Sequence, residues 1–514
     1  MTKKSISRLL QASLMCCLAV LFTACDDIFA SEDNPIPAYL SMSDKPVTIK
    51  VGDTYRRKAI SVTSAVVEYT SSKTDVATVD NEGLVTAKAE GTTTITATAT
   101  GYSSQNGKKI YQPASVSYVV TVVPATVPAT SLTLNKTMEV LATNGDALTI
   151  TATATPSDAT FTWTSSDEAV ATVANGVVTP VGAGIATITA KSGDVKATCE
   201  VFVGNEVDVS SGNPIQNFDI LKGTQNSSSI TIPDGFKVAF NGVTTNKQII
   251  CEGTATIILA DGSTNTVTET SVMKAGIQIG GTGKTLTING ETAGDGKLTV
   301  QGGMGAAGIG TNFDSAGGNI VIDGGTVTAS SGSYAAGIGT GYVTSGTKTF
   351  GTITINGGTV TAQGGSNGAG IGGGYADNAT NECGAIMING GTVTAEGGAG
   401  GAGIGTGAAD YSTNKCSDIT INGGAVTATG GMYGAGIGTA YAYGSTSTNE
   451  CGAITIGTSV TSVTAKKSSS NPGPNSIGKG YAASDGTQTC GTITIGGVVK
   501  AQSDFTAATY TYEP

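Results

Sequence analysis

The sequence predicts an all-β protein, with two sandwich domains followed by a long coil of parallel strands. Three observations lead to this fold class. Glycine is abundant, with 75 residues in 514, and only 13% of the residues are charged. Helices normally draw on Leu, Glu, Lys and Arg, so this composition favours strands. Two segments of the N-terminal half align with each other, and a 33-residue repeat, seen at Ile353, Ile386 and Ile419, runs through the C-terminal half.

Residues 1–24 are predicted to be a secretory signal peptide. Lys3, Lys4 and Arg8 precede an apolar stretch over residues 9–21, and small residues lead to Cys25. This order is typical of a cleaved export signal, and the apolar stretch is too short to span a bilayer comfortably. The segment resembles the lipobox of bacterial lipoproteins, which implies cleavage before Cys25 and lipidation of that residue. Ordinary cleavage that leaves Cys25 free is the alternative.

A polar, flexible tether is predicted over residues 25–38. Its acidic pair, Asp26-Asp27, resembles the export signal of surface lipoproteins in one group of Gram-negative bacteria. That resemblance implies a protein that is anchored in the outer membrane through its lipid and faces the cell exterior. Several acyl chains hold a protein on a membrane far more firmly than one. The leaflet that is finally occupied stays open.

Residues 39–124 and 125–204 are predicted to be two copies of one sandwich domain. Both carry an aromatic-Thr-Ser-Ser run, a Val-Ala-Thr-Val run and a Gly-x-Val-Thr run, which start at Tyr69, Val76 and Gly83 and at Trp163, Val170 and Gly176. Short β-branched runs that alternate with Thr or Ser are typical of half-buried antiparallel strands. The copies resemble the group 2 bacterial immunoglobulin-like domain, which implies immunoglobulin-like sandwiches that act as spacers. We expect Tyr69 and Trp163 to fill the cores rather than to bind sugar, and Cys199 to be a buried free thiol.

Residues 205–514 are predicted to form a parallel β-helix, with a cap and about six 33-residue repeats. Each repeat holds an Ile-Thr-Ile-Asn run, a Thr-Val-Thr-Ala run and a Gly-Ile-Gly run, with some variation. Glycine and β-branched residues disfavour the helices that other repeats of similar length require. Three short strands in each turn instead describe a solenoid whose turns lie about 4.8 Å apart. The segment resembles the pectin-lyase-like, right-handed β-helix superfamily and, more closely, glycine-rich repeats of bacterial surface proteins, which indicates a solenoid rather than an activity.

Stacked turns should place equivalent residues in columns. Two aliphatic columns are expected inside the coil, formed by Ile353, Ile386 and Ile419 and by Ile355, Ile388 and Ile421, while Thr354, Met387 and Thr420 point outward. The turn after the first strand should carry a ladder of amides, with a cation site as the alternative, made by Asn289, Asp323, Asn356, Asn389 and Asn422. A thiol column, or one or two disulfides, is expected from Cys383, Cys416, Cys451 and Cys490. No metal is predicted there, because a linear row does not offer the tetrahedron that zinc requires.

An aromatic residue recurs four positions after the isoleucine of the Gly-Ile-Gly run. The series is interrupted by Ala408 and consists of Phe313, Tyr342, Tyr375, Tyr441 and Tyr481. A row of rings on one face is a candidate platform for glycans, because sugar rings have an apolar face and peripheral hydroxyls. The alternative is that the rings pack on each other and shield the base of a loop.

The composition limits the functions that the chain can have. It has no histidine, which removes the commonest general base, and a net charge of −11 with few basic residues, which argues against nucleic acid as a partner. Enzymes on this fold use clustered carboxylates, and Asp314, Asp377, Asp410 and Asp418 form no recognisable pair. We therefore predict a non-catalytic cell-surface lipoprotein without a cofactor, which binds a polysaccharide or host-surface glycan, or adheres, through its β-helix. A polysaccharide lyase or glycoside hydrolase on the same coil and a structural surface stalk are the alternatives.

Overall fold

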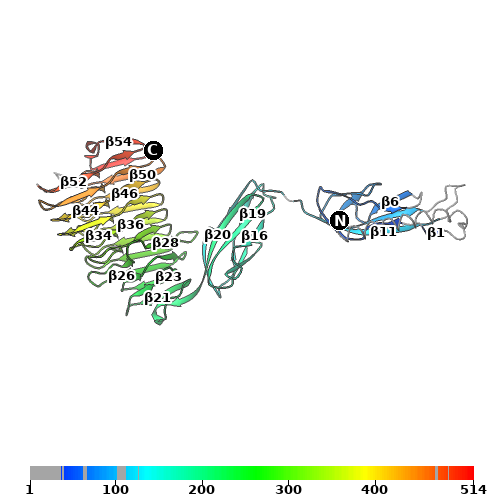
Figure 1. Cartoon of the computed structure of the whole chain (residues 1–514), viewed down its shortest axis with the longest axis horizontal. Coiled ribbons are helices and arrows are strands. Elements are labelled where there is room, and N and C mark those ends of the chain that lie inside the picture. The colour runs from blue at the N-terminus through cyan, green and yellow to red at the C-terminus, as the bar shows by residue number, and fades with distance from the viewer. Residues whose placement is uncertain are drawn as a thin grey trace, which may run out of the picture. The chain divides into compact units, whose positions relative to one another are not determined.

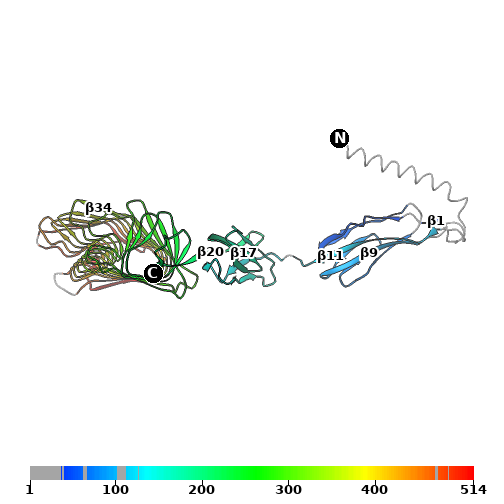
Figure 2. The same cartoon turned by 90° about the horizontal axis from the view of Figure 1, so that it is seen from below.

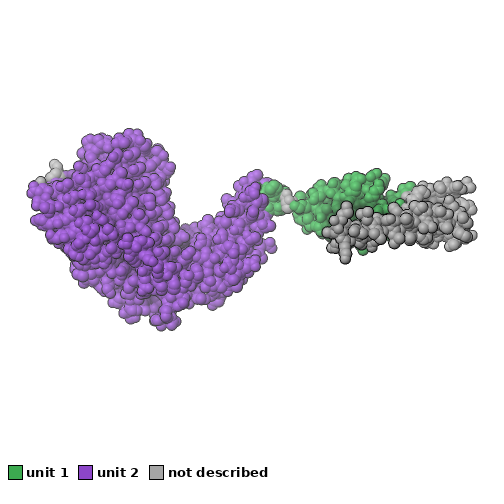
Figure 3. Space-filling model, in the orientation of Figure 1, with its two compact units in different colours: residues 1–129, 158–160 green, residues 130–157, 161–514 purple. Residues whose placement is uncertain are grey.

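The structure is a computed structural model, and it describes residues 36–37, 40–61, 66–100, 111–125, 127–468, 473–483 and 485–514. The predicted signal peptide and Cys25 lie outside these residues. The regular elements of the described chain are strands and short 3₁₀ turns, which confirms the all-β fold class. The chain divides into two compact units, residues 1–129 with 158–160 and residues 130–157 with 161–514 (Figure 3).

The first unit contains the first sandwich domain. One sheet has the order β3 (Val47–Lys50), β11 (Ala114–Val123), β9 (Gly91–Thr100) and β6 (Val66–Ser71), and another has the order β4 (Thr54–Arg56), β8 (Leu84–Ala87) and β7 (Ala77–Val79). Short strand pairs are formed by β1 (Ile36–Pro37) with β10 (Tyr111–Gln112) and by β2 (Leu40–Ser41) with β5 (Ile60–Ser61). Side chains along β9 alternate between buried and half-exposed, as the Thr-Ile-Thr-Ala pattern requires. Tyr69 is buried in this core, and its hydroxyl accepts the Ala59 N–H at 2.7 Å.

The second sandwich domain repeats this arrangement in the second unit. β13 (Met138–Ala142), β20 (Val195–Asp208), β19 (Gly184–Ser192) and β16 (Thr162–Ser165) are joined side by side. The remaining strands are β14 (Leu148–Thr149), β18 (Val177–Pro180) and β17 (Ala171–Ala174), together with the pair β12 (Ser131–Leu134) and β15 (Ala152–Thr155). Trp163 packs against the core of this domain, and Cys199 is a buried free thiol.

The second sandwich and the coil share one continuous sheet (Figure 1). Strand β20 pairs with β13 and β19 inside the sandwich, and its last residues pair in parallel with β21 (Asp219–Gln225), the first strand of the coil. An apolar cluster around Phe202, Ile220 and Ile258 fills the junction. Regular parallel pairing therefore begins within residues 205–284, ahead of the first clear 33-residue repeat.

The coil is made of stacks of parallel strands (Figure 1), and two of these stacks continue the shared sheet. The first stack contains β23 (Lys237–Thr245), β25 (Ala255–Leu259), β28 (Thr285–Gly290), β31 (Asn319–Ile322), β35 (Ile353–Ile355), β40 (Ile386–Ile388), β45 (Ile419–Ile421), β49 (Ile454–Ile456) and β53 (Ile493–Ile495). The second contains β26 (Thr264–Thr268), β29 (Lys297–Gln301), β32 (Thr326–Ser330), β36 (Thr359–Gln363), β41 (Thr392–Glu396), β46 (Gly424–Thr429) and β50 (Val460–Lys466).

A separate sheet holds the Gly-Ile-Gly runs. It contains β22 (Ile230–Ile232), β24 (Ile249–Cys251), β27 (Ile277–Ile279), β30 (Ile309–Gly310), β33 (Ile338–Gly339), β37 (Ile371–Gly372), β42 (Ile404–Gly405), β47 (Ile437–Gly438) and β51 (Ile477–Gly478). The later turns also have a strand that the sequence reading missed, seen in β34 (Thr347–Phe350), β39 (Thr380–Cys383), β44 (Thr413–Cys416), β48 (Thr448–Cys451) and β52 (Thr487–Cys490). The prediction of three strands in every turn is therefore wrong for these turns.

The register of the turns is the predicted one. Ile353, Ile386 and Ile419 pair in sequence, and so do Ile355, Ile388 and Ile421, and all of them are completely buried. Thr354, Met387 and Thr420 lie between them and are half-exposed. Equivalent residues of successive turns therefore stand directly above one another, which confirms the parallel β-helix.

The C-terminal end of the coil is covered by its own chain. β54 (Val498–Lys500) pairs antiparallel with β53, and β55 (Thr509–Tyr512) pairs antiparallel with β50, so the chain reverses direction. Between them, a 3₁₀ turn (Gln502–Phe505) places the Phe505 side chain in the coil's core. Figure 1 shows the C-terminus at this end of the coil, and Figure 2 views the stacked turns from below.

Candidate functional site

The five aromatic residues predicted as a glycan platform lie directly after the Gly-Ile-Gly strands. The rings of Phe313 and Tyr342 have centroids 5.2 Å apart, and those of Tyr342 and Tyr375 stack at 5.1 Å. Tyr441 and Tyr481 form a second group, at 5.5 Å. The structure thus brings the first three rings together and the last two together, with Ala408 at the equivalent position between them.

Three further tyrosines join these rings and were missed by the sequence reading. Tyr334 lies 5.5 Å from Tyr342, Tyr433 lies 4.4 Å from Tyr441, and the Tyr443 ring lies 3.7 Å from that of Tyr441. Tyr334 and Tyr433 each stand four residues before the isoleucine of their Gly-Ile-Gly run, so the same spacing counted backwards would have found them. We call the combined set the tyrosine face: Phe313, Tyr334, Tyr342, Tyr375, Tyr433, Tyr441, Tyr443 and Tyr481.

The exposed part of this surface lies mainly at the missed residues. The five predicted rings are half-buried, because they pack against one another. Tyr334 and Tyr443 are each 38% exposed, and Tyr411 on the neighbouring loop is 58% exposed. A ligand would therefore meet the rings of Tyr334, Tyr443 and Tyr411 before those of the inner row.

Two carboxylates of the coil serve as partners of tyrosine hydroxyls. Tyr342 Oη donates to Asp377 Oδ2 at 3.1 Å, and Tyr375 Oη donates to Asp410 Oδ2 at 3.4 Å. Burial and the hydrogen bond to Asp377 raise the pKa of Tyr342 to about 12, and burial also raises the pKa of Tyr375. Both hydroxyls therefore stay protonated at physiological pH and keep their hydrogen bonds to the two aspartates.

The other two aspartates considered as catalytic candidates, Asp314 and Asp418, accept hydrogen bonds from nearby residues of the coil. Asp314 accepts hydrogen bonds from Ser345 and from the Thr344 N–H, and lies 3.7 Å from the Lys348 ammonium group. Although burial opposes ionisation, these hydrogen bonds hold the pKa of Asp314 below its usual value. Asp418 accepts the Ala453 N–H at 2.8 Å. These four aspartates thus have local roles in binding the turns of the coil together.

The amide row forms a hydrogen-bonded ladder along the coil axis. The side-chain nitrogen of Asn356 donates to Asp323 at 2.7 Å, that of Asn389 donates to Asn356 at 2.8 Å, and that of Asn422 donates to Asn389 at 2.9 Å. Asn289 is not brought into this ladder, because its Oδ1 accepts the N–H of the following Gly290 at 2.9 Å. The chain leaves the coil at this point and forms a loop toward the second sandwich.

The four repeat cysteines are in register on the strands that the sequence reading missed. Cys383, Cys416, Cys451 and Cys490 pair in sequence, and in the described structure they are free thiols. Hydrogen bonds with the neighbouring thiols, together with burial, hold the pKa of Cys416 well above its usual value. A second column lies two residues earlier on the same strands and consists of Asn381, Asn414, Asn449 and Gln488.

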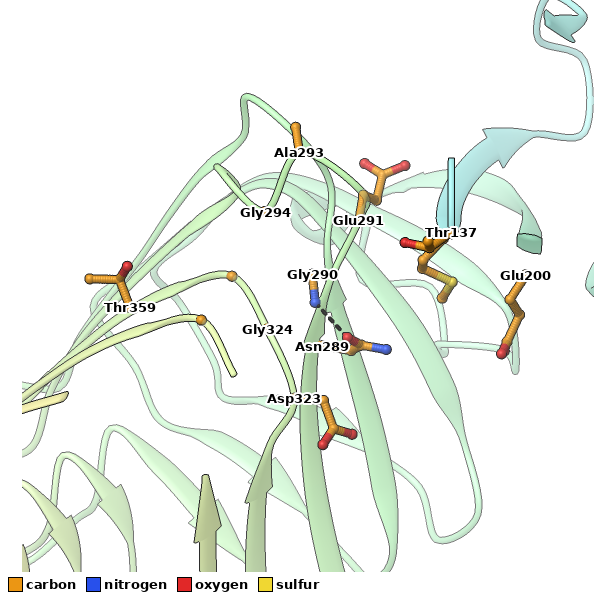
Figure 4. A pocket seen from close by; sticks show the side chains of 13 residues that line it. Thr137, Glu200, Asn289, Gly290, Glu291, Ala293, Gly294, Asp323, Gly324 and Thr359 are labelled. Atoms are coloured by element: carbon orange, nitrogen blue, oxygen red, sulfur yellow. Dashed lines mark hydrogen bonds between the residues drawn. The ribbon is translucent and has the colours of Figure 1, made fainter. Parts of the chain in front are cut away.

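A pocket of about 490 Å³ lies where the second sandwich meets the coil (Figure 4). Its lining includes Thr137 and Glu200 from the sandwich and Asn289, Glu291 and Asp323 from the coil. This polar, acidic lining was not predicted, because it combines sandwich and coil residues that are about 90 to 190 positions apart in the sequence.

The loop beside this pocket attaches the coil to the sandwich. The Thr292 N–H donates to the Met138 carbonyl at 2.9 Å, and the Thr292 hydroxyl accepts the N–H groups of Thr137 and Met138. The Glu291 carboxylate accepts the N–H groups of Val140 and Asp261. Burial raises the pKa of Glu291 to about 7, and the nearby carboxylates of Glu139 and Asp261 act in the same direction. A carboxyl group whose pKa lies near physiological pH therefore lies at the contact between the second sandwich and the coil.

Two kinds of site are absent from the described residues. Within these ranges, no helix is long and apolar enough to cross a membrane. In the same part of the chain, no group of three or more Cys, Asp or Glu side chains is arranged to hold a metal ion.

Two family models match segments of the chain, one in its N-terminal half and one in its C-terminal half. The model of the bacterial Ig-like domain (group 2) matches residues 39–109 and 128–201. The model of the beta helix repeat matches residues 320–342, 353–375, 386–408 and 419–441. No curated protein matches the chain.

The chain is also similar to parts of solved structures. Mouse cadherin-23 EC22-24 is 17% identical with a TM-score of 0.17, over 34% of this chain and 65% of that chain, which is under two thirds of its length. Domains 4-9 of the surface layer protein SbsC are 20% identical with a TM-score of 0.15, over 35% of this chain and 32% of that chain. Mouse protocadherin-24 EC1-3 is 13% identical with a TM-score of 0.18, over 34% of this chain and 71% of that chain. From the family matches, the chain carries two group 2 bacterial immunoglobulin-like domains followed by a region of β-helix repeats.

Proposed function

We propose that the chain is a non-catalytic surface protein that binds glycans through the tyrosine face of its coil. The observation that carries this proposal is the gathering of rings on one face, with Tyr334, Tyr443 and the neighbouring Tyr411 exposed. Exposed rings beside hydrogen-bonding groups suit sugars, which offer an apolar ring face and peripheral hydroxyls. The inner rings support two of the exposed ones, because Tyr334 packs on Tyr342 and Tyr443 packs on Tyr441.

The charge of the coil favours neutral glycans over acidic ones. Residues 301–465 contain eight Asp and Glu residues and two Lys residues. Charges of one sign repel a ligand of the same sign over roughly 10 Å at moderate ionic strength. A polymer of uronic acids would therefore be repelled by this part of the coil, whereas a neutral polysaccharide would not.

We expect the variant with Tyr334→Ala, Tyr411→Ala and Tyr443→Ala to lose glycan binding. Each exposed ring contributes on the order of 0.5–1.5 kcal/mol, so the three together should weaken binding by about tenfold or more. Affinity electrophoresis of the purified chain through gels with β-glucan, mannan, xylan or polygalacturonate measures this retention. The melting temperature should change little, because the three side chains are exposed.

The control variant carries Val498→Ala and Val499→Ala, which change exposed apolar side chains at the end of the coil. It should keep the retention of the unmodified chain. Unchanged retention of the tyrosine variant would remove the tyrosine face as the binding site. Shortened polysaccharide chains would contradict a non-catalytic role, and no retention of the unmodified chain on any polysaccharide would favour a structural stalk.

We also propose that lipidated Cys25 anchors the chain in the outer membrane, with the coil facing the cell exterior and the immunoglobulin-like domains as spacers. This proposal is supported by the order of basic, apolar and small residues before Cys25. Cys25→Ser should move the chain from the membrane fraction to the soluble fraction of fractionated cells. A chain that stays in the membrane fraction after this substitution would contradict the anchor.

A further inference from the structure

The thiol column is a row of metal-ligating side chains that glycan binding does not use. It consists of Cys383, Cys416, Cys451 and Cys490, which pair in sequence on adjacent strands and are free thiols. Hydrogen bonds join the Cys416 thiol to those of Cys383 and Cys451, and they join the Cys451 thiol to that of Cys490. The four sulfurs therefore face one another along the coil axis.

The spacing of this row is longer than a disulfide requires. Equivalent atoms on neighbouring strands of a sheet lie about 4.8 Å apart. A disulfide needs Cβ atoms about 3.5–4.5 Å apart, so a bridge between two in-register cysteines would pull their turns together. The aliphatic columns oppose that movement, because Ile386 and Ile388 are held in register between the equivalent residues of the turns on either side. The column therefore keeps its sulfurs available as separate ligands.

A single metal ion between two neighbouring sulfurs fits the same spacing. Metal–sulfur bonds are about 2.3 Å long, so two of them in line span about 4.6 Å. The cysteine side chains point into the core, across the coil axis. An ion on the axis thus lies roughly at a right angle to each Cβ–Sγ bond, which is the direction in which a thiolate sulfur forms a second bond. Linear binding by two thiolates is typical of monovalent copper, a soft ion that prefers sulfur ligands.

The column is closed at one end and accessible at the other. On the preceding turn the equivalent position is Phe350, which belongs to the apolar core of the coil. Cys490, at the opposite end, is half-buried, and its thiol hydrogen-bonds with the Gln502 side chain. An ion can therefore enter at Cys490, while the core keeps water away from the inner sulfurs.

We propose that the thiol column binds monovalent copper, with one ion in line between Cys383 and Cys416 and a second between Cys451 and Cys490. Each ion forms two copper–sulfur bonds and displaces the protons of two thiols, which leave to solvent. The copper arrives and stays monovalent, so nothing is oxidised or reduced. This pairing uses all four sulfurs, whereas an ion between Cys416 and Cys451 would leave both end sulfurs without a partner.

Copper retention by the reduced full chain, kept without oxygen, tests this proposal. Cu(I) is added, loosely held ions are removed with a Cu(I) chelator, and the retained copper is measured per chain. The variant with Cys416→Ala and Cys451→Ala should retain two ions fewer than the unmodified chain, because Cys383 and Cys490 are three turns apart. Cys490→Ala should retain one ion fewer. Cys251→Ala, which replaces a buried cysteine outside the column, is the control and should retain as many ions as the unmodified chain.

X-ray absorption at the copper edge reports the geometry of the ions in the unmodified chain, and this measurement does not depend on the folding of any variant. Two sulfur neighbours per ion would support the linear arrangement, and three or more would contradict it. Zinc ions should not displace the copper, because the row offers no tetrahedron.

Equal copper retention by the unmodified chain and by the Cys416→Ala, Cys451→Ala variant would overturn the proposal. Disulfides among the four cysteines, found by mass mapping of the chain after its free thiols are alkylated, would also overturn it, because they would consume the ligands. The melting temperatures of the copper-free chains show whether each variant keeps its fold.

Discussion

Replacing Gly405 by alanine is expected to destabilise the coil by about 2–6 kcal/mol. Gly405 has a φ of +138°, and a methyl group built on it would overlap the carbonyl oxygen of Gly438 on the next turn. An alanine forced into such a conformation costs on the order of 1–3 kcal/mol, and the overlap costs a similar amount. The equivalent glycines of neighbouring turns, Gly339 and Gly372, have the same backbone conformation and the same kind of close approach. The spacing of the turns therefore depends on the absence of a side chain here.

Denaturant unfolding, followed by far-UV circular dichroism, measures this loss. Gly281→Ala is the matched control, because a methyl group at Gly281 would meet nothing within 4 Å. It should change the free energy of unfolding by no more than about 0.5 kcal/mol. A Gly405→Ala chain as stable as this control would show that the turns can separate enough to admit a side chain.

The second unit is expected to lose stability as the pH rises through the range of Glu291. The pKa of this group rises from 4.5 in the unfolded chain to about 7 in the folded one, mainly because it is buried. Below pH 4.5, the Glu291 carboxyl is protonated in both the folded and the unfolded chain, and it does not lower the free energy of unfolding. Above the higher value, the folded chain must hold a buried carboxylate, which costs up to about 3 kcal/mol at 1.36 kcal/mol per pKa unit. Stability should therefore fall as the pH rises from about 4.5 to about 7 and stay level above it.

Glu291→Gln should remove this pH dependence. The free energy of unfolding, measured between about pH 5 and pH 8, should fall for the unmodified chain and stay nearly constant for the variant. Glu396→Gln, at an exposed position of the coil, is the control and should keep the slope of the unmodified chain. Parallel pH profiles for the unmodified chain and Glu291→Gln would contradict the assignment.

The sequence was sufficient to predict the stacking of the coil. A step of 33 residues, together with the alternation of Ile and Thr, determines which side chains face inward and which residues lie above one another. The columns of Ile353 and Ile355 follow from these two facts alone. The strand Thr380–Cys383, in contrast, was missed because its residue types are not typical of a strand. Its Thr-Asn-Glu-Cys run looks like a polar loop, although Asn381 and Cys383 point inward.

The contacts of the candidate site could be predicted only in part. The predicted rings do lie on one face. The periodicity of the sequence does not show which rings are buried under others, so the more exposed Tyr334 and Tyr443 were missed. The junction pocket depends on the contact of Thr292 with Thr137, which are 155 residues apart in the chain. No local pattern reports such a contact. Asn289 left the expected ladder for the same reason, because its loop is directed toward the sandwich.

The unbroken path of strand β20 has a mechanical consequence. Val195–Asp208 forms hydrogen bonds with strands of the second sandwich along most of its length and with the first strand of the coil at its end. Inter-strand hydrogen bonds lie across the strand direction. A pulling force transmitted along β20 therefore shears many bonds at once instead of peeling them apart one at a time. Tension between the second sandwich and the coil is therefore distributed over many inter-strand hydrogen bonds of the sheet.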